Sequence, residues 1–118
     1  MADKLFSKKH IWIEPNGNNF KIGITKYAQE QLGNIMFLNL PDPGERVEIG
    51  NRFGDIESIK TVSDLISPVT GIVVKVNEAL LDDLDSINEN SWFAEIKVTS
   101  TSDELMTEDM YLERKESF

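Results

Sequence analysis

The chain has 118 residues, of which 12 are basic and 21 acidic, which gives a formal net charge of −9. This length suits a single domain covering residues 1–118, with a core large enough to fold without disulfides. The absence of cysteine excludes disulfides and thiolate metal sites, and a single histidine, His10, argues against a His-rich metal site or a Ser-His-Asp triad.

Two strands and a short helix are expected in the first third of the chain. In residues 20–24 apolar side chains alternate with polar or small ones, as they do in a half-buried strand. Thr25 can cap a helix that extends through Gln31 and stops at Gly33. The next run, residues 35–40, is apolar on both faces and predicts an interior strand.

The middle of the chain predicts a tight hairpin. Two strand-like runs, residues 53–58 and 61–66, meet with no glycine or proline between them. A hairpin of this kind would hold Lys60 at its tip, in solvent. Eleven residues later Gly71 is expected to supply the positive φ of the next turn, with Pro68 making its approach rigid.

Two more strands and a helical C-terminus complete the expected elements. Apolar residues alternate in residues 72–76 and again in residues 92–98. Thr101 begins a Thr-Ser-Asp-Glu sequence that fits a capping box, so one or two helices are expected from Ser102 to about Lys115. The side chains of this tail that would pack against the sheet are Leu105, Met106, Met110, Tyr111 and Leu112.

These elements predict a mainly β fold. Turn signals rich in proline, glycine and asparagine recur at close spacing, and short apolar runs lie between them. This spacing favours an all-β sandwich or barrel over alternating βαβ units. We expect a flattened β-barrel or sandwich of two antiparallel sheets, with short helices and a helical C-terminus.

The distribution of charge narrows the range of partners. Residues 1–77 contain equal numbers of basic and acidic residues, so the whole acidic excess lies in residues 78–118. An acidic body disfavours nucleic acid and anionic membranes, and no apolar run approaches the ~20 residues that span a bilayer. We expect a monomer with no nucleic-acid or membrane partner. We also expect a cytoplasmic, bacterial-type chain without a targeting peptide, or a mature form without its presequence.

The sequence lacks the common motifs of catalysis by the chain itself. It contains no phosphate-binding G-x-x-x-x-G-K-[ST] loop, no G-x-S-x-G and no H-E-x-x-H. Acidic pairs such as Asp82-Asp83 are adjacent in sequence, which is typical of a solvated surface rather than of paired acid and base groups. We therefore expect a protein that is not an enzyme on its own.

Lys60 is the residue whose predicted setting suggests chemistry. A lysine on a stiff hairpin tip can enter the site of a modifying enzyme without unfolding of the domain. Acylation would remove its charge and make it the root of a long flexible arm. Since an exposed lysine is most often only a solvated surface group, the segments around it decide between the two interpretations.

The segments around Lys60 form a motif that consists of Glu57-Ser58-Ile59-Lys60, Ser63-Asp64 and Ser67-Pro68-Val69-Thr70-Gly71. This motif is similar to the lipoylation motif of the glycine cleavage system H-protein family of lipoyl carriers. Further similar segments follow in order along nearly the whole chain, among them His10-Ile11-Trp12, Ile22-Gly23-Ile24-Thr25, Leu40-Pro41-Asp42-Pro43-Gly44 and Val76-Asn77-Glu78-Ala79-Leu80. A biotin carrier would instead show Met-Lys-Met at the tip.

The resemblance implies a barrel-sandwich hybrid of the lipoyl-domain type and a carrier function. Lys60 would bear lipoate in amide linkage, attached by a lipoate ligase or an octanoyltransferase. The arm would shuttle an aminomethyl group from a pyridoxal-phosphate-dependent glycine decarboxylase to a tetrahydrofolate-dependent aminomethyltransferase. Dihydrolipoamide dehydrogenase would then reoxidise the dithiol. The difficult chemistry would belong to the cofactors and partners.

The resemblance also implies the residues of a cofactor-binding cleft. In this family the loaded arm folds back into a cleft on its own domain, which shields the adduct from water. The apolar wall of that cleft falls at Ile24, Ala28 and Leu32, which at i, i+4 and i+8 share one face. Asp64 matches a carboxylate that meets the amine of the adduct. Alternatively, the three apolar residues could only pack the helix on the sheet, and Asp64 could be an ordinary solvated residue. The remaining cofactor-binding positions of the motif are Glu57, Ser58 and Gly71.

One departure from the family pattern leaves an alternative open. The family usually has His-Glu-Trp near its start, where the glutamate also serves the amine, whereas this chain has His10-Ile11-Trp12. Loss of a hydrogen bond to a charged group weakens binding by about 1.5–3 kcal/mol. The alternative is an H-protein-like lipoyl or octanoyl relay that serves 2-oxoacid dehydrogenases or another set of redox partners. A third hypothesis is an unmodified interaction module.

Overall fold

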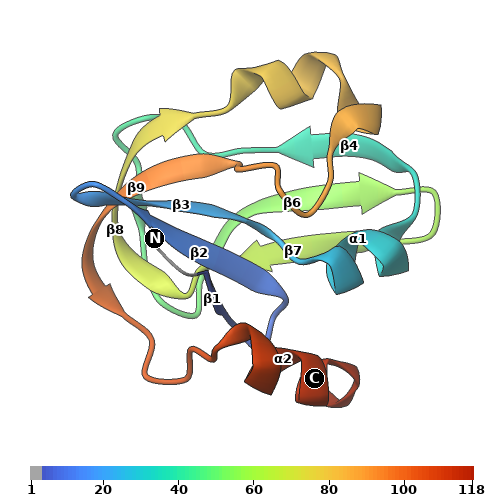
Figure 1. Cartoon of the computed structure of the whole chain (residues 1–118). Helices are drawn as coiled ribbons and strands as arrows, with labels where there is room; N and C mark the ends of the chain where they lie inside the picture. Colours follow the sequence, from blue (N-terminus) through green and yellow to red (C-terminus); the bar gives the residue numbers. More distant parts are fainter. Residues whose placement is uncertain (1–3) are drawn as a thin grey trace.

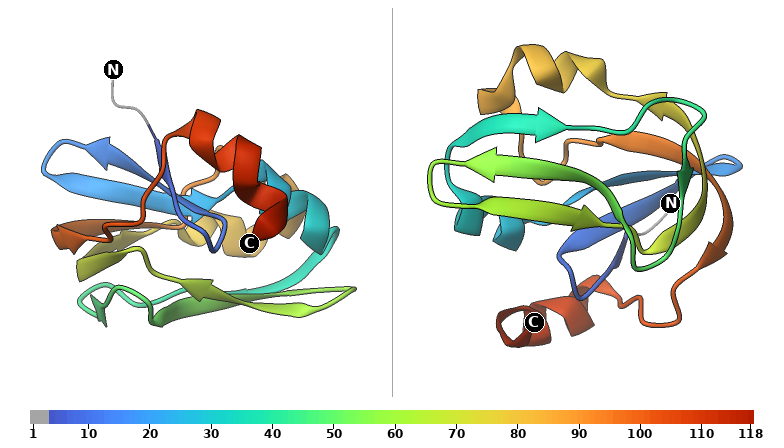
Figure 2. Two further views of the ribbon diagram at one scale, coloured as in Figure 1. Left: turned by 90° about the horizontal axis from the view of Figure 1, so that it is seen from below. Right: turned by 180° about the vertical axis from the view of Figure 1, so that it is seen from behind.

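The computed structural model describes residues 4–118 and contains two antiparallel β-sheets that face each other (Figures 1 and 2). The larger sheet has the strand order β1-β2-β3-β9-β8-β5 and the smaller has the order β4-β6-β7. The sandwich form of the expected mainly β fold is confirmed, but the sheets do not close into a barrel. The strands are β1 Leu5–Phe6, β2 Ile11–Asn16, β3 Asn19–Ile24, β4 Ile35–Asn39, β5 Arg46–Val47, β6 Arg52–Ser58, β7 Val62–Ile66, β8 Val69–Val76 and β9 Ala94–Thr101.

The main core lies between the two sheets. Alternate residues of the central strands point inward, so that Ile22, Val73 and Ile96 from the larger sheet meet Ile56 from the smaller one. All four side chains are almost completely buried. Full burial of such a side chain contributes about 1.5–3 kcal/mol, and this burial holds the sheets together.

Helix α1, Lys26–Leu32, forms where the sequence predicts it. The Thr25 hydroxyl accepts a hydrogen bond of 3.2 Å from the backbone N–H of Ala28, which satisfies one of the free donors at the helix start. The helix ends at Gly33, whose φ of 70° is a conformation that glycine adopts without steric cost. Two 3₁₀ helices, η1 Glu78–Asp82 and η2 Leu84–Ser86, lie between β8 and β9.

The C-terminal helix begins later than the sequence predicts. Thr101 does not open a capping box, because it is the last residue of β9 and pairs with Val69. The cap of α2, Glu108–Arg114, is Thr107, whose hydroxyl accepts from the backbone N–H of Met110. The helix is followed by η3, Lys115–Ser117. Of the tail side chains expected to pack inward, Met106 and Tyr111 are buried and Leu105 is half-buried, whereas Met110 and Leu112 are exposed.

Strand β4 is an edge strand, so the prediction of an interior strand at residues 35–40 is wrong. It pairs with β6 on one side only within the described chain. A register shift between Ile35 and Phe37 adds one residue to this strand, as in a β-bulge. As a result Ile35 and Leu38 point into the core, while Met36 and Phe37 are both exposed.

Candidate functional site

Lys60 lies on the turn that joins β6 to β7, where the sequence predicts it, and its side chain is exposed. Ser58 ties this turn together. Its backbone N–H donates to the carbonyl oxygen of Thr61 at 2.8 Å, and its Oγ accepts from the N–H groups of Lys60 and Thr61, each at 3.2 Å. Because two amides of the turn bind one buried hydroxyl, the backbone that carries Lys60 is stiff.

A second contact holds the turn against the end of α1. The N–H of Ile59 donates to the carbonyl oxygen of Asn34 at 3.2 Å. The side chain of Lys60 extends over Gly33, since a Cβ built on this glycine would lie 3.6 Å from Lys60 Cε and 3.8 Å from Nζ. Sequence reasoning assigned Gly33 only to the end of a helix and missed its contact with Lys60. No local pattern signals a contact between two segments so far apart in the chain.

A cleft of about 180 Å³ begins beside Lys60, at Thr61. The three positions predicted for an apolar wall, Ile24, Ala28 and Leu32, line one side of it. Residues of β7 line the other side, and they include the predicted carboxylate Asp64. The structure thus brings these four residues together next to Lys60. It does not place Glu57 or Gly71 among the residues that line the cleft.

The charged groups of the cleft are few. Asp64 is its one carboxylate among the described lining residues, and its side chain is more than half exposed. Arg52 Nη1 lies 3.7 Å from Asp64 Oδ1 and 2.8 Å from Asp55 Oδ2, so Arg52 shares its charge between two acids. Lys9 and the buried Ile11 also line the cleft, and Ile11 pairs in register with Ile24. Ile11, the position at which the resemblance implies a glutamate, is therefore an apolar part of the cleft wall.

His10 connects the cleft to the C-terminal helix. Its Nδ1 is hydrogen-bonded to the hydroxyl of Tyr111, which also bonds Thr25 Oγ1 at 2.8 Å. Burial, with a smaller contribution from the nearby Lys9 charge, holds the pKa of His10 below its usual value. Burial likewise raises the pKa of Tyr111. Since His10 also lines the cleft, this network joins α2 to one wall of the candidate site.

Gly71 differs from its prediction, since it is not among the positive-φ glycines. It lies inside β8, where it pairs with Val47 and Val98. A Cβ at this position would lie 2.2 Å from the carbonyl oxygen of Lys97, which is an impossible contact. Glycine is needed here because β9 approaches closely. The requirement therefore comes from packing and not from a turn.

Glu57 lies on the outer face of the smaller sheet. In the register of the three strands it is flanked by Phe37 on β4 and Val62 on β7. Its side chain is exposed, and no ion pair within residues 4–118 includes it. Glu57 therefore faces solvent and does not line the cleft.

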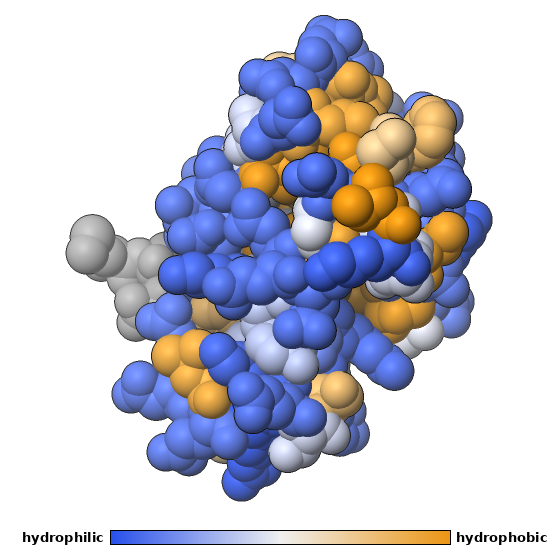
Figure 3. Space-filling model, turned by 90° about the vertical axis from the view of Figure 1, so that its right-hand side faces the viewer, coloured by the Kyte–Doolittle hydropathy of each residue, from blue (hydrophilic) through white to orange (hydrophobic). Residues whose placement is uncertain are grey.

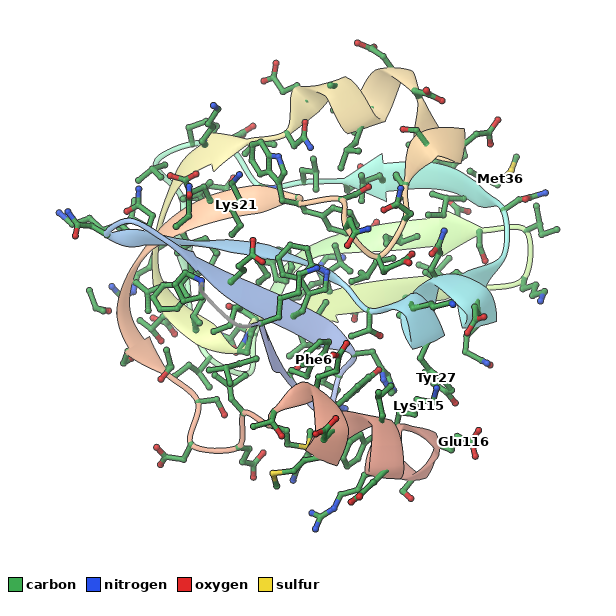
Figure 4. The ribbon with its side chains drawn as sticks, viewed as in Figure 1. Phe6, Lys21, Tyr27, Met36, Lys115 and Glu116 are labelled. Atoms are coloured by element: carbon green, nitrogen blue, oxygen red, sulfur yellow. The ribbon has the colours of Figure 1, made fainter. Side chains whose placement is uncertain are left out.

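A larger hollow of about 460 Å³ lies on the other side of α1, among residues of β1, β2 and α2. Tyr27 and Lys115 approach each other at its edge, with Lys115 Nζ 5.5 Å from the Tyr27 ring centroid (Figure 4). None of its described lining residues belongs to the β6–β7 turn. Although this hollow is larger than the cleft, it is not the candidate site, because it does not adjoin Lys60.

The fold agrees with comparisons to known proteins. A family model described as Glycine cleavage H-protein matches residues 4–118. The chain belongs to this family. It is 41% identical over 114 residues to the glycine cleavage system H protein of Staphylococcus carnosus (strain TM300), which covers 92% of this chain and 90% of that protein. It is 43% identical over 112 residues to the corresponding protein of Geobacillus kaustophilus (strain HTA426), which covers 90% of this chain and 88% of that protein.

The H-protein fold is also confirmed in three dimensions. The crystal structure of a glycine cleavage system H protein from Mycobacterium marinum matches with a TM-score of 0.89 at 36% identity, covering 97% of both chains. Family membership supports the role of a lipoyl carrier in glycine cleavage, and the relay alternative is not favoured. Within residues 4–118, no helix has the length and the apolar surface to cross a bilayer.

Proposed function

We propose that Lys60 is the lipoyl attachment site and that this H-protein carries an aminomethyl group on the resulting arm. The observation that carries the proposal is an exposed amine on a stiff turn, directly beside an apolar cleft. Among residues 4–118 no ion pair includes Lys60, so its amine is free to meet a modifying enzyme. Ser58 supports this role because its hydroxyl stiffens the turn.

Attachment is a simple acyl transfer onto Lys60. The Nζ amine gives up a proton and forms a bond to the carbonyl carbon of a lipoyl group activated as its adenylate, and the bond from that carbon to AMP breaks. ATP supplies the activation, through a lipoate ligase. Without its positive charge, the modified side chain can lie in an apolar cleft at lower desolvation cost.

The residues of the cleft fit a lipoyl arm. Ile24, Ala28 and Leu32 offer an apolar wall for a hydrocarbon chain, and burial there excludes water from whatever the arm carries. Once attached, lipoate would supply a dithiolane as the acceptor of the aminomethyl group, and the dithiol that remains after delivery would be the form that is reoxidised. Asp64 is the group that would attract a cationic amine, although Arg52 competes for its charge.

The partners follow from the family and from the chemistry assigned to the arm. Glycine decarboxylase with its pyridoxal phosphate would load it, an aminomethyltransferase with tetrahydrofolate would unload it, and dihydrolipoamide dehydrogenase would reoxidise it. We place the carrier with these partners in the cytoplasm. The chain itself binds, shields and presents the arm and performs none of these steps.

Intact-mass measurement of Lys60→Arg tests the attachment site. After incubation with a lipoate–protein ligase, ATP and lipoic acid, the native sequence is expected to gain one lipoyl mass. The arginine variant should gain none, because a guanidinium is not an acyl acceptor at neutral pH. Lys97→Arg, at an exposed lysine of β9, is the matched control and should gain the full mass. A lipoyl mass on the Lys60→Arg variant would show that the site is elsewhere.

A second measurement tests what the arm carries. Lipoylated protein is expected to support exchange between the carboxyl group of glycine and bicarbonate when mixed with glycine decarboxylase. If fully lipoylated protein supports no exchange with an active decarboxylase, the aminomethyl role is wrong and the relay role regains support.

A further inference from the structure

Apolar side chains gather around Lys60 on the outside of the molecule. Ile59, Val62 and Phe37 are 64%, 61% and 60% exposed, which makes them the three most exposed large apolar side chains of the described chain. Met36, 50% exposed, lies at the same end and points outward (Figure 4). Figure 3, which views this end, shows apolar side chains gathered on its upper part. We name Met36, Phe37, Ile59 and Val62 the tip patch.

The tip patch is continuous with the turn that carries Lys60. Ile59 precedes this lysine directly, and Val62 opens the strand that follows it. Phe37 lies two strands away in the same register row, with Glu57 between it and Val62. Large apolar side chains exposed side by side are uncommon on the surface of a monomer and often mark an interaction surface.

We propose that the tip patch is the docking surface for the enzyme that acylates Lys60, a proposal that rests on the attachment site proposed above. That enzyme must bring its activated acyl carbon to Nζ itself, so its surface has to touch the residues around the turn. Partners that act on the dithiolane meet the far end of a long arm and need no contact with the turn. The tip patch therefore fits the acylating enzyme better than any later partner.

The charge within the tip patch indicates what that enzyme presents. Glu57 is exposed between two apolar side chains and takes part in no described ion pair. Two residues from Glu57 on the same face of β6, Asp55 pairs with Asp64, and Arg52 lies beside both carboxylates. The complementary surface is apolar with one cationic side chain opposite Glu57. Such a pair steers encounter and depends on ionic strength, while the apolar contact does not.

The test compares rates of lipoylation, read by intact mass, with a lipoate–protein ligase, ATP and lipoic acid. The double variant Phe37→Thr/Val62→Thr is expected to lower kcat/KM by about tenfold, as loss of a central apolar contact does. Glu57→Gln is expected to lower kcat/KM by a smaller factor at low salt and to have no effect at high salt. The matched control is Ile72→Thr/Val74→Thr, at two residues of β8 that are 38% and 43% exposed on the larger sheet. It should be lipoylated at the native rate.

A second arm separates docking of this enzyme from docking of later partners. The Phe37→Thr/Val62→Thr protein, driven to full lipoylation by long incubation, should have its reduced arm reoxidised by dihydrolipoamide dehydrogenase and NAD⁺ at the native rate. Thermal unfolding confirms that each variant is folded before its rate is compared.

Three results would overturn the proposal. One is a double variant that is lipoylated at the native rate. If the native sequence is fully lipoylated in the same experiment, the docking proposal fails while the proposed attachment site still stands. Another is a native protein that elutes as a dimer and a double variant that elutes as a monomer, which would make a second copy of this chain the occupant. The third is an equal loss in the β8 control. A native sequence that gains no lipoyl mass would instead refute the proposed function itself.

Discussion

The outer faces of both sheets carry apolar side chains, but the described chain covers only those of the larger sheet. On the larger sheet Phe6 and Trp12 point outward from β1 and β2, and the C-terminal segment covers them with Met106 and Tyr111. On the smaller sheet Phe37 and Val62 also point outward, and nothing in the described chain covers them. The same kind of side chain is buried at one face and exposed to solvent at the other.

The covered face is a small second core. Phe6 and Met106 exchange two backbone hydrogen bonds of 2.8 Å, and the rings of Phe6 and Tyr111 stack with centroids 5.1 Å apart. Tyr111 also bonds Thr25, at the start of α1. Figure 2 shows the C-terminal helix outside the larger sheet, where these contacts attach it. Loss of any one of these contacts should loosen the tail from the sheet.

The largest effect on stability is therefore expected from Tyr111→Ala. It removes a buried aromatic ring and leaves His10 and Thr25 without their shared partner, so the free energy of unfolding should fall by about 3–5 kcal/mol. Urea unfolding measures the change. Leu112→Ala, at the exposed neighbour of Tyr111 on α2, is the control and should change the free energy by less than about 1 kcal/mol. Equal losses in the two variants would mean that the tail does not form a specific core.

A smaller effect is expected from acid, through His10. Burial lowers its pKa in the folded protein, so at pH values just below its ordinary pKa of about 6.5 the unfolded chain binds more protons than the folded one. The free energy of unfolding should then fall as the pH drops through this region and should recover above it. In His10→Gln this part of the pH dependence should disappear, as urea unfolding at pH 5 to 8 would show. An unchanged slope in the variant would assign the effect to other groups.

The sequence predicted the strands and the turn at Lys60 because their determinants are local. Alternation of side chains follows from the pleat of a strand, and the cap at Thr25 requires only residues within one helical turn. The residues around Lys60 were also predictable through their resemblance to a known family. Ile24, Ala28 and Leu32, the wall positions that the resemblance implies, line one cleft in the structure, and their role in holding an arm stays a prediction.

The predictions that were wrong have a common cause. In each case a strand that is distant in sequence determines the conformation or the exposure of the residue. Thr101 has a good capping sequence but is held in β9 by its pairing with Val69. Gly71 comes three residues after Pro68 and looks like a turn residue, yet the close approach of the Lys97 backbone from β9 explains why this position is glycine. The exposure of Phe37 depends on a bulge in β4 and on the absence of a further strand beside it in the described chain. None of these partners lies close in sequence.

The smallest effect on stability is expected at the uncovered face, and it makes the comparison of the two faces sharper. Phe37→Thr and Val62→Thr place threonine, which strands accommodate well, at both positions and remove side chains that are mostly in water, so each should change the free energy of unfolding by less than about 1 kcal/mol. Urea unfolding beside Tyr111→Ala provides the direct contrast. A loss as large as that of Tyr111→Ala would show that the tip patch belongs to the core, and slow lipoylation of the double variant could then reflect a damaged turn. A near-native stability combined with slow lipoylation would mean that these apolar side chains contact the acylating enzyme and contribute little to the stability of the fold.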